Sequence, residues 1–185
     1  MATDRVLHGS AMSGILTDSQ IRQRTTDQKL IEGFSDACIA PASYELRIGR
    51  FRDPDTQSLV ELNEGEVLEV QSGGFILLGT IERVNLPLDL VGVMYLRSSY
   101  ARRGFTSWFQ GLVDPGYEGK LTVALHNVSR ANLALLGGDR ICHLVFEQLP
   151  EKANRPYSGN YNQSEGATPA PILKIPAGAR VVRRV

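Results

Sequence analysis

The sequence has few of the residues that bind transition metals or build disulfide frameworks. Its 185 residues include two cysteines and three histidines, and the cysteines, Cys38 and Cys142, lie far apart. Zinc sites usually need closely spaced Cys and His ligands, so a structural or catalytic zinc site is not expected. Both cysteines have apolar neighbours, which predicts two buried free thiols.

Several cofactor and phosphate motifs are also missing. There is no Gly-x-x-x-x-Gly-Lys-Ser/Thr loop, and no Gly-x-Gly-x-x-Gly follows an expected strand. The His-x-Glu and Pro-Cys-x-x-Cys signature of zinc-dependent deaminases is absent as well. Any chemistry is therefore expected to use carboxylates, arginines, hydroxyl groups and the backbone.

Long apolar runs and an excess of charge are absent too. No run approaches the roughly 20 apolar residues that a membrane helix needs, and the N-terminus lacks the apolar core of a signal peptide. Lys plus Arg number 20, as do Asp plus Glu, so net charge gives no attraction to nucleic acid or anionic membrane. We therefore expect a cytoplasmic globular protein with no nucleic-acid or membrane partner.

Short apolar segments separated by turn residues predict a mainly β protein, a sandwich, jelly roll or barrel, with one or two short helices. A helix is expected to begin at Thr17, because Thr17 and Gln20 have capping-box spacing. Strands are expected at 41–49, 65–70, 74–84, 89–98, 120–127, 131–137 and 140–149. Residues 1–14 are predicted to form a flexible arm, 15–150 one β domain, and 151–185 a tail docked on it.

The densest polar cluster follows the expected strand at 89–98. It contains Arg97, Ser98, Ser99, Arg102 and Arg103. Hydroxyl groups and guanidinium groups at a strand end can bind a polyphosphate, because the arginine fork matches two phosphate oxygens. A solvated basic turn is the alternative, and these residues alone leave both open.

Asp114 follows in GLVDPGY (111–117), directly before a Pro-Gly turn. An Asp at this place can simply shape the turn. It can also be a carboxylate at the rim of a site, where it would orient a water molecule. The Arg-Ser-Ser sequence before it and Tyr117 after it favour the second interpretation.

Segments along most of the chain, from about residue 15 to 166, resemble the motifs of the dCTP deaminase and trimeric dUTPase superfamily. In chain order they are ILTDSQI (15–21), PASYELRIG (41–49), RSSYAR (97–102), GLVDPGYEG (111–119), GGDRICHLVFEQL (137–149) and RPYSGNYNQSEGAT (155–168). Glu45 stands where the family usually has Asp. The ordered series of motifs, rather than any single one, carries the resemblance.

The resemblance implies a distorted β-barrel or jelly roll, assembled as a homotrimer with sites between subunits. The implied partner is a pyrimidine deoxynucleoside triphosphate, dUTP or dCTP, with Mg²⁺ on its phosphates and no metal ligand from the chain. The tail is expected to close over the nucleotide. The roles it implies are phosphate binding for Arg97, Ser98, Ser99 and Arg102, catalysis for Asp114, sugar or base contact for Tyr117, Gln110 and Trp108, and a tail contribution from Tyr157 and Gln163.

The resemblance also bears on the reaction. Deaminases of this superfamily carry a catalytic Glu on the strand after the hairpin, near C4 of cytosine, and that position holds Ala124. Alternation along the strand expected at 120–127 predicts that Thr122 and Ala124 lie on the face opposite to Leu121, Val123 and Leu125. Asn160 and Ser164 replace the Lys and Gln of the deaminase tail. Hydrolysis of dUTP needs mainly positioning and charge stabilisation, and Asp114 matches the residue that activates water in dUTPases.

Hydrolysis of dUTP to dUMP and pyrophosphate is therefore the main prediction. Three departures count against it: Trp108 replaces a base-contacting Asn, His143 replaces a phosphate-binding Gln, and the glycine-rich fifth motif of dUTPases is absent. One alternative is deamination of dCTP, with an acid supplied by Glu118 or Glu147. The other is nucleotide binding without catalysis.

Overall fold

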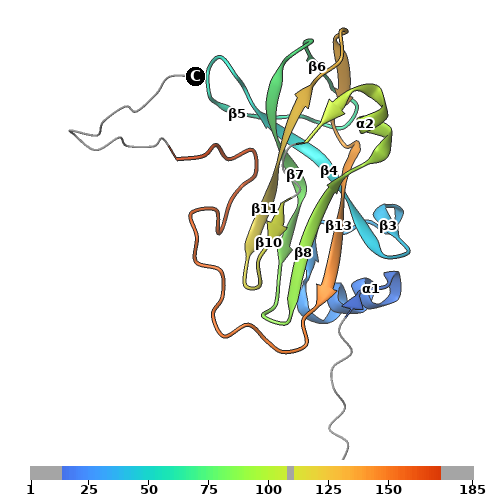
Figure 1. Cartoon of the computed structure of the whole chain (residues 1–185), viewed down its shortest axis with the longest axis vertical. Helices are drawn as coiled ribbons and strands as arrows, with labels where there is room; N and C mark the ends of the chain where they lie inside the picture. Colours follow the sequence, from blue (N-terminus) through green and yellow to red (C-terminus); the bar gives the residue numbers. More distant parts are fainter. Residues whose placement is uncertain (1–13, 108–110, 172–185) are drawn as a thin grey trace, which may run out of the picture.

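The computed structural model describes residues 14–107 and 111–171, and these form mainly β-structure (Figure 1). The strands are β1 (Gly14–Ile15), β2 (Ile31–Glu32), β3 (Ile39–Ala40), β4 (Ser43–Arg52), β5 (Leu59–Glu61), β6 (Val67–Val70), β7 (Phe75–Asn85), β8 (Leu90–Leu96), β9 (Phe105–Thr106), β10 (Leu112–Val113), β11 (Glu118–Asn127), β12 (Leu133–Leu136) and β13 (Arg140–Gln148). Every range predicted to be a strand overlaps one of these. The short strands β1, β2, β3, β5, β9 and β10 were not predicted individually.

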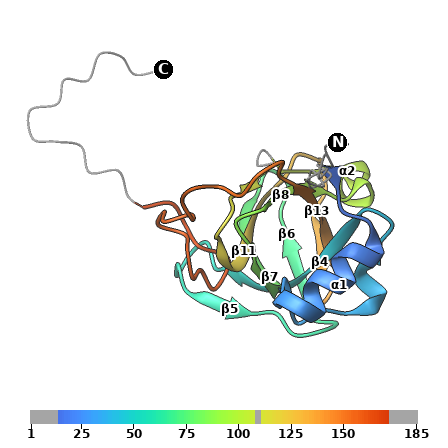
Figure 2. The ribbon, with the colours of Figure 1, turned by 90° about the horizontal axis from the view of Figure 1, so that it is seen from below.

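The main sheet has the strand order β10-β8-β13-β4-β7-β11-β9, and its neighbours pair antiparallel. A separate two-stranded sheet is formed by β12 and β6. Figure 2, which looks along the strands, shows the main sheet curved into an incomplete barrel. This confirms the prediction of a mainly β, distorted-barrel fold with few helices.

The first helix, α1 (Asp18–Gln28), lies at one end of the sheet (Figure 1). It begins as predicted, because the backbone N–H of Thr17 donates to Gln20 Oε1 at 2.9 Å. A left-handed residue, Lys29 with φ of 54°, ends it. A short 3₁₀ turn, η1 (Asp36–Cys38), precedes β3.

A second helix, α2 (Ser98–Arg103), lies at the opposite end of the sheet, where the sequence predicted the end of a strand and a basic turn. The strand expected at 89–98 ends at Leu96. Tyr100 anchors the helix, since its ring is buried and its hydroxyl donates to Asp139 Oδ2 at 2.7 Å. Gly104, with φ of 108°, ends it, as is common for glycine after a helix.

The core lies inside the curve of the sheet. Alternation along β11 buries Leu121, Val123 and Leu125 and leaves Thr122 and Ala124 half-buried on the other face, as predicted. The largest fully buried side chains are Tyr44, Phe105, Phe146, Ile21, Leu30, Leu46, Ile48, Leu78, Leu90, Leu125, Leu135 and Ile141. Each such aliphatic or aromatic side chain contributes about 1.5–3 kcal/mol by leaving water.

Cys38 and Cys142 are buried and unpaired, as predicted. Burial raises the pKa of the Cys142 thiol to about 12. Its thiol therefore stays protonated at neutral pH, and a protonated thiol is a poor nucleophile.

No helix in the described part of the chain is long and apolar enough to cross a membrane. The cytoplasmic location stays a prediction. So does the division into arm, domain and tail, since 1–13 and 172–185 lie outside the described residues.

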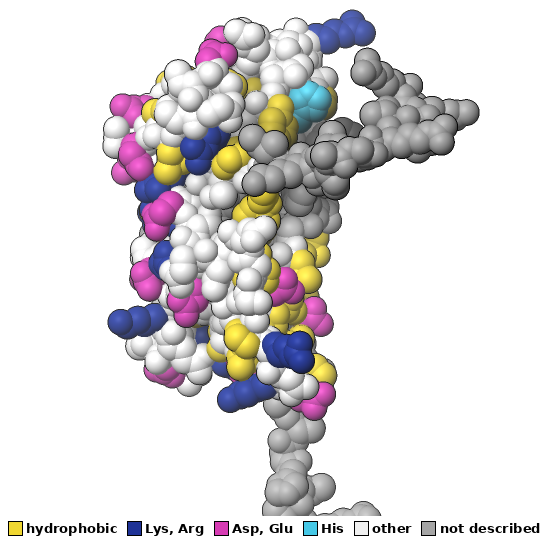
Figure 3. Space-filling view, turned by 90° about the vertical axis from the view of Figure 1, so that its left-hand side faces the viewer, with side chains coloured by type: hydrophobic (Ala, Val, Ile, Leu, Met, Phe, Trp, Pro, Cys, Tyr) yellow, Lys and Arg dark blue, Asp and Glu magenta, His cyan; other side chains and the backbone are white. Residues whose placement is uncertain are grey.

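After β13 the chain runs back along the outside of β11 as an extended segment, 150–171 (Figure 1). On the face drawn in Figure 3, acidic and basic side chains of the described residues are interspersed. This segment and β11 together form the walls of the site described next.

Candidate functional site

The hairpin between β10 and β11 is held by a tight turn at Asp114–Tyr117. The backbone N–H of Tyr117 donates to the carbonyl of Asp114 at 3.1 Å, and Gly116 donates to Leu86 at 2.9 Å. Gly116 has φ of 83°, and a Cβ there would lie 2.5 Å from Cβ of Pro156 on the tail. Glycine is therefore required both for the turn and for the close approach of the tail.

A cavity of about 710 Å³ lies between this hairpin and the tail. It is lined by Asp114 and Tyr117 from the hairpin, Ala124 from β11, and Tyr157 from the tail, among others. The structure therefore brings together three of the predicted site residues, Asp114, Tyr117 and Tyr157. Trp108 and Gln110, predicted to contact sugar or base, lie outside the described residues.

Tyr117 forms the floor of the hairpin end of this cavity. Its side chain is buried, its hydroxyl donates to the carbonyl of Lys120 at 2.8 Å, and its ring centroid lies 5.7 Å from that of Tyr157. Burial raises the pKa of Tyr117 to about 12, so the phenol is neutral at physiological pH. It can offer a ring face to a ligand, as the predicted sugar contact requires.

The wall formed by β11 and β7 is mainly apolar, with Thr122 as its polar side chain. Ala124 pairs across the sheet with Leu77, and both line the cavity together with Phe75 and Leu121. Asp114, which is half-buried, is the one carboxylate among the described lining residues. Neither Glu118 nor Glu147 lines the cavity; both are exposed.

The tail is fixed to β11 by backbone hydrogen bonds. The N–H of Lys120 donates to the carbonyl of Ser164 at 2.7 Å, and the N–H of Thr168 donates to Thr122 Oγ1 at 3.0 Å. A Cβ on Gly119 would lie 2.9 Å from the Ser164 nitrogen, so glycine is needed for this contact.

Gln163, a predicted tail residue of the site, contacts the hairpin rather than the cavity. Its backbone N–H donates to the carbonyl of Glu118 at 2.6 Å, and its side chain contacts Glu118 and Arg83.

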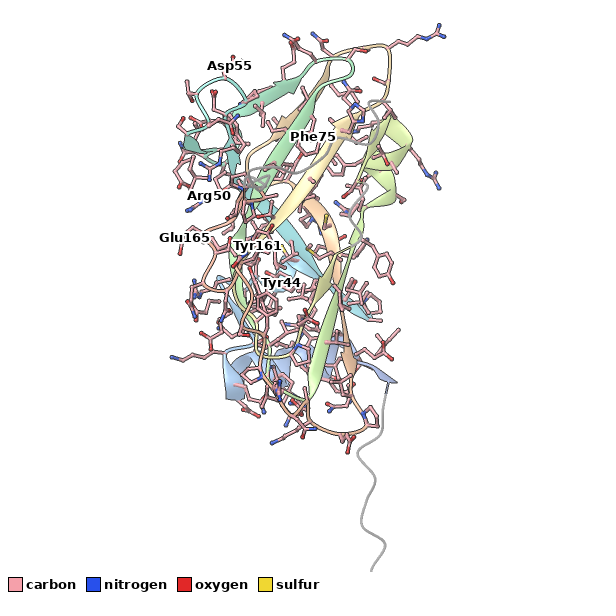
Figure 4. All side chains as sticks on the ribbon, turned by 60° about the vertical axis from the view of Figure 1, so that its left-hand side comes forward. Tyr44, Arg50, Asp55, Phe75, Tyr161 and Glu165 are labelled. Atoms are coloured by element: carbon pink, nitrogen blue, oxygen red, sulfur yellow. The ribbon has the colours of Figure 1, made fainter. Side chains whose placement is uncertain are left out.

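Glu165 of the tail forms ion pairs with the sheet. Its carboxylate lies between Arg50 and Arg83, with N–O distances of 3.5 and 3.6 Å. Figure 4 shows Arg50 and Glu165 side by side where the tail crosses the sheet.

The predicted phosphate-binding residues lie elsewhere. Arg97 precedes α2, and Ser98, Ser99 and Arg102 lie on its exposed surface. None of the four lines the cavity of Asp114. Within one chain, the hairpin site and the basic cluster are separate.

Two features of these regions were not foreseen. Arg97 Nε lies 2.8 Å from Oε1 of the buried Glu45, and the same carboxylate contacts Arg140. A glutamate expected within an apolar strand usually needs a cationic partner, and this signal could have predicted the pair. The ion pairs of Glu165 had no comparable signal, because an exposed tail glutamate is ordinary.

A second cavity, larger at about 850 Å³, lies between α1, β1 and the end of β13. Its lining includes Arg24, Asp89 and Gln148 but none of the predicted site residues. These three side chains bind one another. The smaller cavity, which contains three of the predicted site residues, is therefore the candidate site.

Comparison with known proteins places the chain in a family. The model of the dCTP deaminase-like family matches residues 15–149. A dCTP deaminase from Pyrococcus horikoshii is 39% identical over 81% of this chain and 92% of its own length. A "dCTP deaminase, dUMP-forming" from Mycolicibacterium vanbaalenii is 32% identical over 84% of this chain and 94% of its own.

A solved structure agrees with the fold. The 2′-deoxycytidine 5′-triphosphate deaminase of Agrobacterium tumefaciens superposes with a TM-score of 0.61 at 19% identity. The match covers 74% of this chain, which spans about half, 49%, of that structure. At this identity the comparison supports the fold alone.

These findings correct the prediction about the reaction. We preferred dUTP hydrolysis over dCTP deamination because Ala124 replaces the deaminase Glu, and that preference was wrong: the relatives at 32–39% identity are named dCTP deaminases. The replacements at Ala124, Asn160 and Ser164 are therefore not evidence enough to assign dUTP hydrolysis to a chain with these relatives. The match over residues 15–149 and the identity to these relatives establish that the chain belongs to the dCTP deaminase-like family, within the dCTP deaminase and dUTPase superfamily.

Proposed function

We propose that this chain binds dCTP in the cavity between the hairpin and the tail and deaminates it to dUTP. The proposal rests on one observation about the site: Asp114, Tyr117 and Tyr157 line the same cavity. The relatives of the chain are named dCTP deaminases, which indicates the reaction. Tyr117 and Tyr157 supply ring faces for the sugar and base. The apolar wall excludes water from the base.

Asp114 is the proposed catalytic residue. Deamination adds water at C4 of cytosine and moves a proton to the amino nitrogen, which leaves as ammonia. Asp114 would accept the proton of the attacking water and return it to the leaving nitrogen. It is the carboxylate that lines the cavity within the described residues.

The triphosphate would be bound by Arg97, Ser98, Ser99 and Arg102. These residues lie outside the cavity of their own chain. We therefore propose that they serve the cavity of a neighbouring copy in a homotrimer. Mg²⁺ would arrive on the phosphates of the nucleotide, because the described residues contain no group of three or more His, Cys, Asp or Glu side chains that could hold a metal ion.

A second candidate is binding of dCTP without deamination. Ala124 favours it, because it lines the cavity at the position of the deaminase Glu and carries no group able to transfer a proton. The two candidates share the binding site and differ only in turnover.

The deciding experiment incubates the purified protein with Mg²⁺ and dCTP and measures ammonia and dUTP, with binding measured by calorimetry. Formation of dUTP supports deamination, and binding without dUTP supports the second candidate. Absence of dCTP binding would contradict both. The Asp114→Asn variant should lower turnover by about 100-fold or more and keep dCTP affinity. Asp27→Asn, at an exposed residue of α1 that does not line this cavity, should change neither.

A further inference from the structure

A buried carboxylate lies beside the predicted phosphate-binding arginine. Glu45 on β4 is 7% exposed and contacts two guanidinium groups. Its Oε1 lies 2.8 Å from Arg97 Nε, and its Oε2 accepts a hydrogen bond from Arg140 Nη1 at 2.7 Å. Two guanidinium groups are the kind of partner that a carboxylate this deeply buried needs to offset its loss of hydration.

These contacts restrict the guanidinium group of Arg97. Its Nη1 donates to the backbone carbonyl of Arg140 at 3.0 Å, while Nε is held by Glu45. The backbone N–H of Arg97 also donates to Ile141 at 2.9 Å. Nη2 makes no hydrogen bond to a described residue, and the side chain is 27% exposed. One nitrogen of a fixed guanidinium group is thus left for an external anion.

The strand register explains why the carboxylate meets this arginine. Glu45 lies opposite His143 on β13, and His143 lies opposite Tyr95 on β8, two residues before Arg97. His143 Nε2 is 4.0 Å from Glu45 Oε1, and its Nδ1 is 3.2 Å from Ser43 Oγ. Three neighbouring strands therefore bring Glu45 to the end of β8.

We propose that Glu45 is a positioning residue for the triphosphate of the bound nucleotide, acting through Arg97. The inference rests on the proposed function. A free arginine side chain carries about 2 kcal/mol of rotamer entropy, and a guanidinium group already fixed by protein contacts loses less of it when it binds phosphate. Glu45 holds Arg97 so that Nη2 meets a phosphate oxygen.

The negative charge of Glu45 works in the opposite direction, because it repels phosphate. Arg140 offsets this repulsion: two arginines and one carboxylate give the cluster a net charge of +1. The positioning effect is expected to exceed the remaining repulsion. The sign of the effect of Glu45→Gln therefore tests the proposal directly.

The test measures the affinity of Mg²⁺·dCTP and of dCMP for the full chain by calorimetry. We expect Glu45→Gln to weaken dCTP binding about ten-fold, and dCMP binding less than about two-fold, because dCMP lacks the outer phosphates. In an Arg97→Met background, Glu45→Gln should add no further loss, as a double-mutant cycle requires for a residue that acts through another. Equal weakening of both ligands, additive losses, or tighter dCTP binding would overturn the proposal.

Glu61→Gln is the matched control. It removes the same charge from another arginine-paired glutamate, one that contacts Arg50 and not Arg97, so dCTP affinity should stay within about two-fold of wild type. If Glu45→Gln does not fold, Arg97→Lys is the second variant, because lysine keeps the positive charge but cannot make the Nε contact to Glu45. It should show the same selective loss of affinity for dCTP. Unchanged dCTP affinity in Arg97→Lys would contradict the positioning role. Wild-type protein that binds no dCTP would instead refute the proposed function itself.

Discussion

Ala124 on β11 lies directly across the sheet from Leu77 on β7, and both side chains line the cavity that contains Asp114. In the deaminases that the chain resembles, the position of Ala124 holds the acid that serves C4 of cytosine. The cavity wall here is apolar at that point. Under the proposed function, Ala124 would remove a group that transfers protons and would leave the walls of the cavity in place.

Replacing Ala124 by Glu should increase deamination. The side chain would enter the cavity from a half-buried position, and a positioned general acid–base group contributes about 100- to 10,000-fold. We expect at least about a ten-fold rise in ammonia release from dCTP, since the new carboxylate would not be perfectly oriented. Ala124→Gln has nearly the same size and cannot transfer the proton. Equal rates for the two variants would contradict this role for the position.

Glu165 should stabilise the tail against the sheet. Its carboxylate contacts Arg50 and Arg83 but is 60% exposed, so each ion pair is worth at most about 1 kcal/mol. Glu165→Gln is expected to speed amide hydrogen exchange at residues 163–168 by about two- to five-fold and leave the core amides unchanged. Glu151→Gln, an exposed residue nearer β13, is the control. Unchanged exchange in the Glu165 variant would show that the backbone contacts alone hold the tail.

Glu82 should contribute far more to stability than the exposed Glu61. The Glu82 side chain is fully buried; it accepts hydrogen bonds from Arg47 Nε at 2.7 Å and from the Arg47 backbone at 2.9 Å. Glu82→Gln leaves a partly buried guanidinium without its counter-charge, which should cost about 3 kcal/mol in the free energy of unfolding. Glu61→Gln removes an ion pair to Arg50 whose acid is 61% exposed, and should cost less than about 1 kcal/mol. Urea unfolding of both variants provides the measurement, and similar losses would refute the distinction.

Local patterns in the sequence predicted much of this molecule, but not the contacts between distant segments. Alternation along β11 predicted which face carries Ala124, because a strand exposes every second side chain. The helix α2 was missed, since its sequence has one buried anchor, Tyr100, instead of a repeating apolar stripe. The separation of Arg97 from the Asp114 cavity depends on how the sheet curves, which spacing along the chain does not reveal.

Asp89 should make stability depend on pH in the acid range. Arg24 Nη2 donates to Asp89 Oδ2 at 3.1 Å, and Gln148 Nε2 donates to the same oxygen at 3.3 Å. Partial burial favours the neutral carboxyl, but the hydrogen bonds from Arg24 and Gln148 hold the pKa of Asp89 below its usual value. The folded protein therefore binds this proton more weakly than the unfolded chain, in which the pKa of Asp is about 3.9.

The stabilisation from Asp89 is consequently complete above about pH 5 and is lost as the pH falls through the folded-state pKa. Near pH 7, Asp89→Asn should lower the free energy of unfolding by about 1–2 kcal/mol. The difference between wild type and variant should shrink as the pH is lowered from about 5 to 3. Asp27→Asn, an exposed residue of α1, is the control and should show little effect at either pH. A difference for Asp89→Asn that stayed constant down to about pH 3 would mean that its hydrogen bonds do not depend on the charge of the carboxylate.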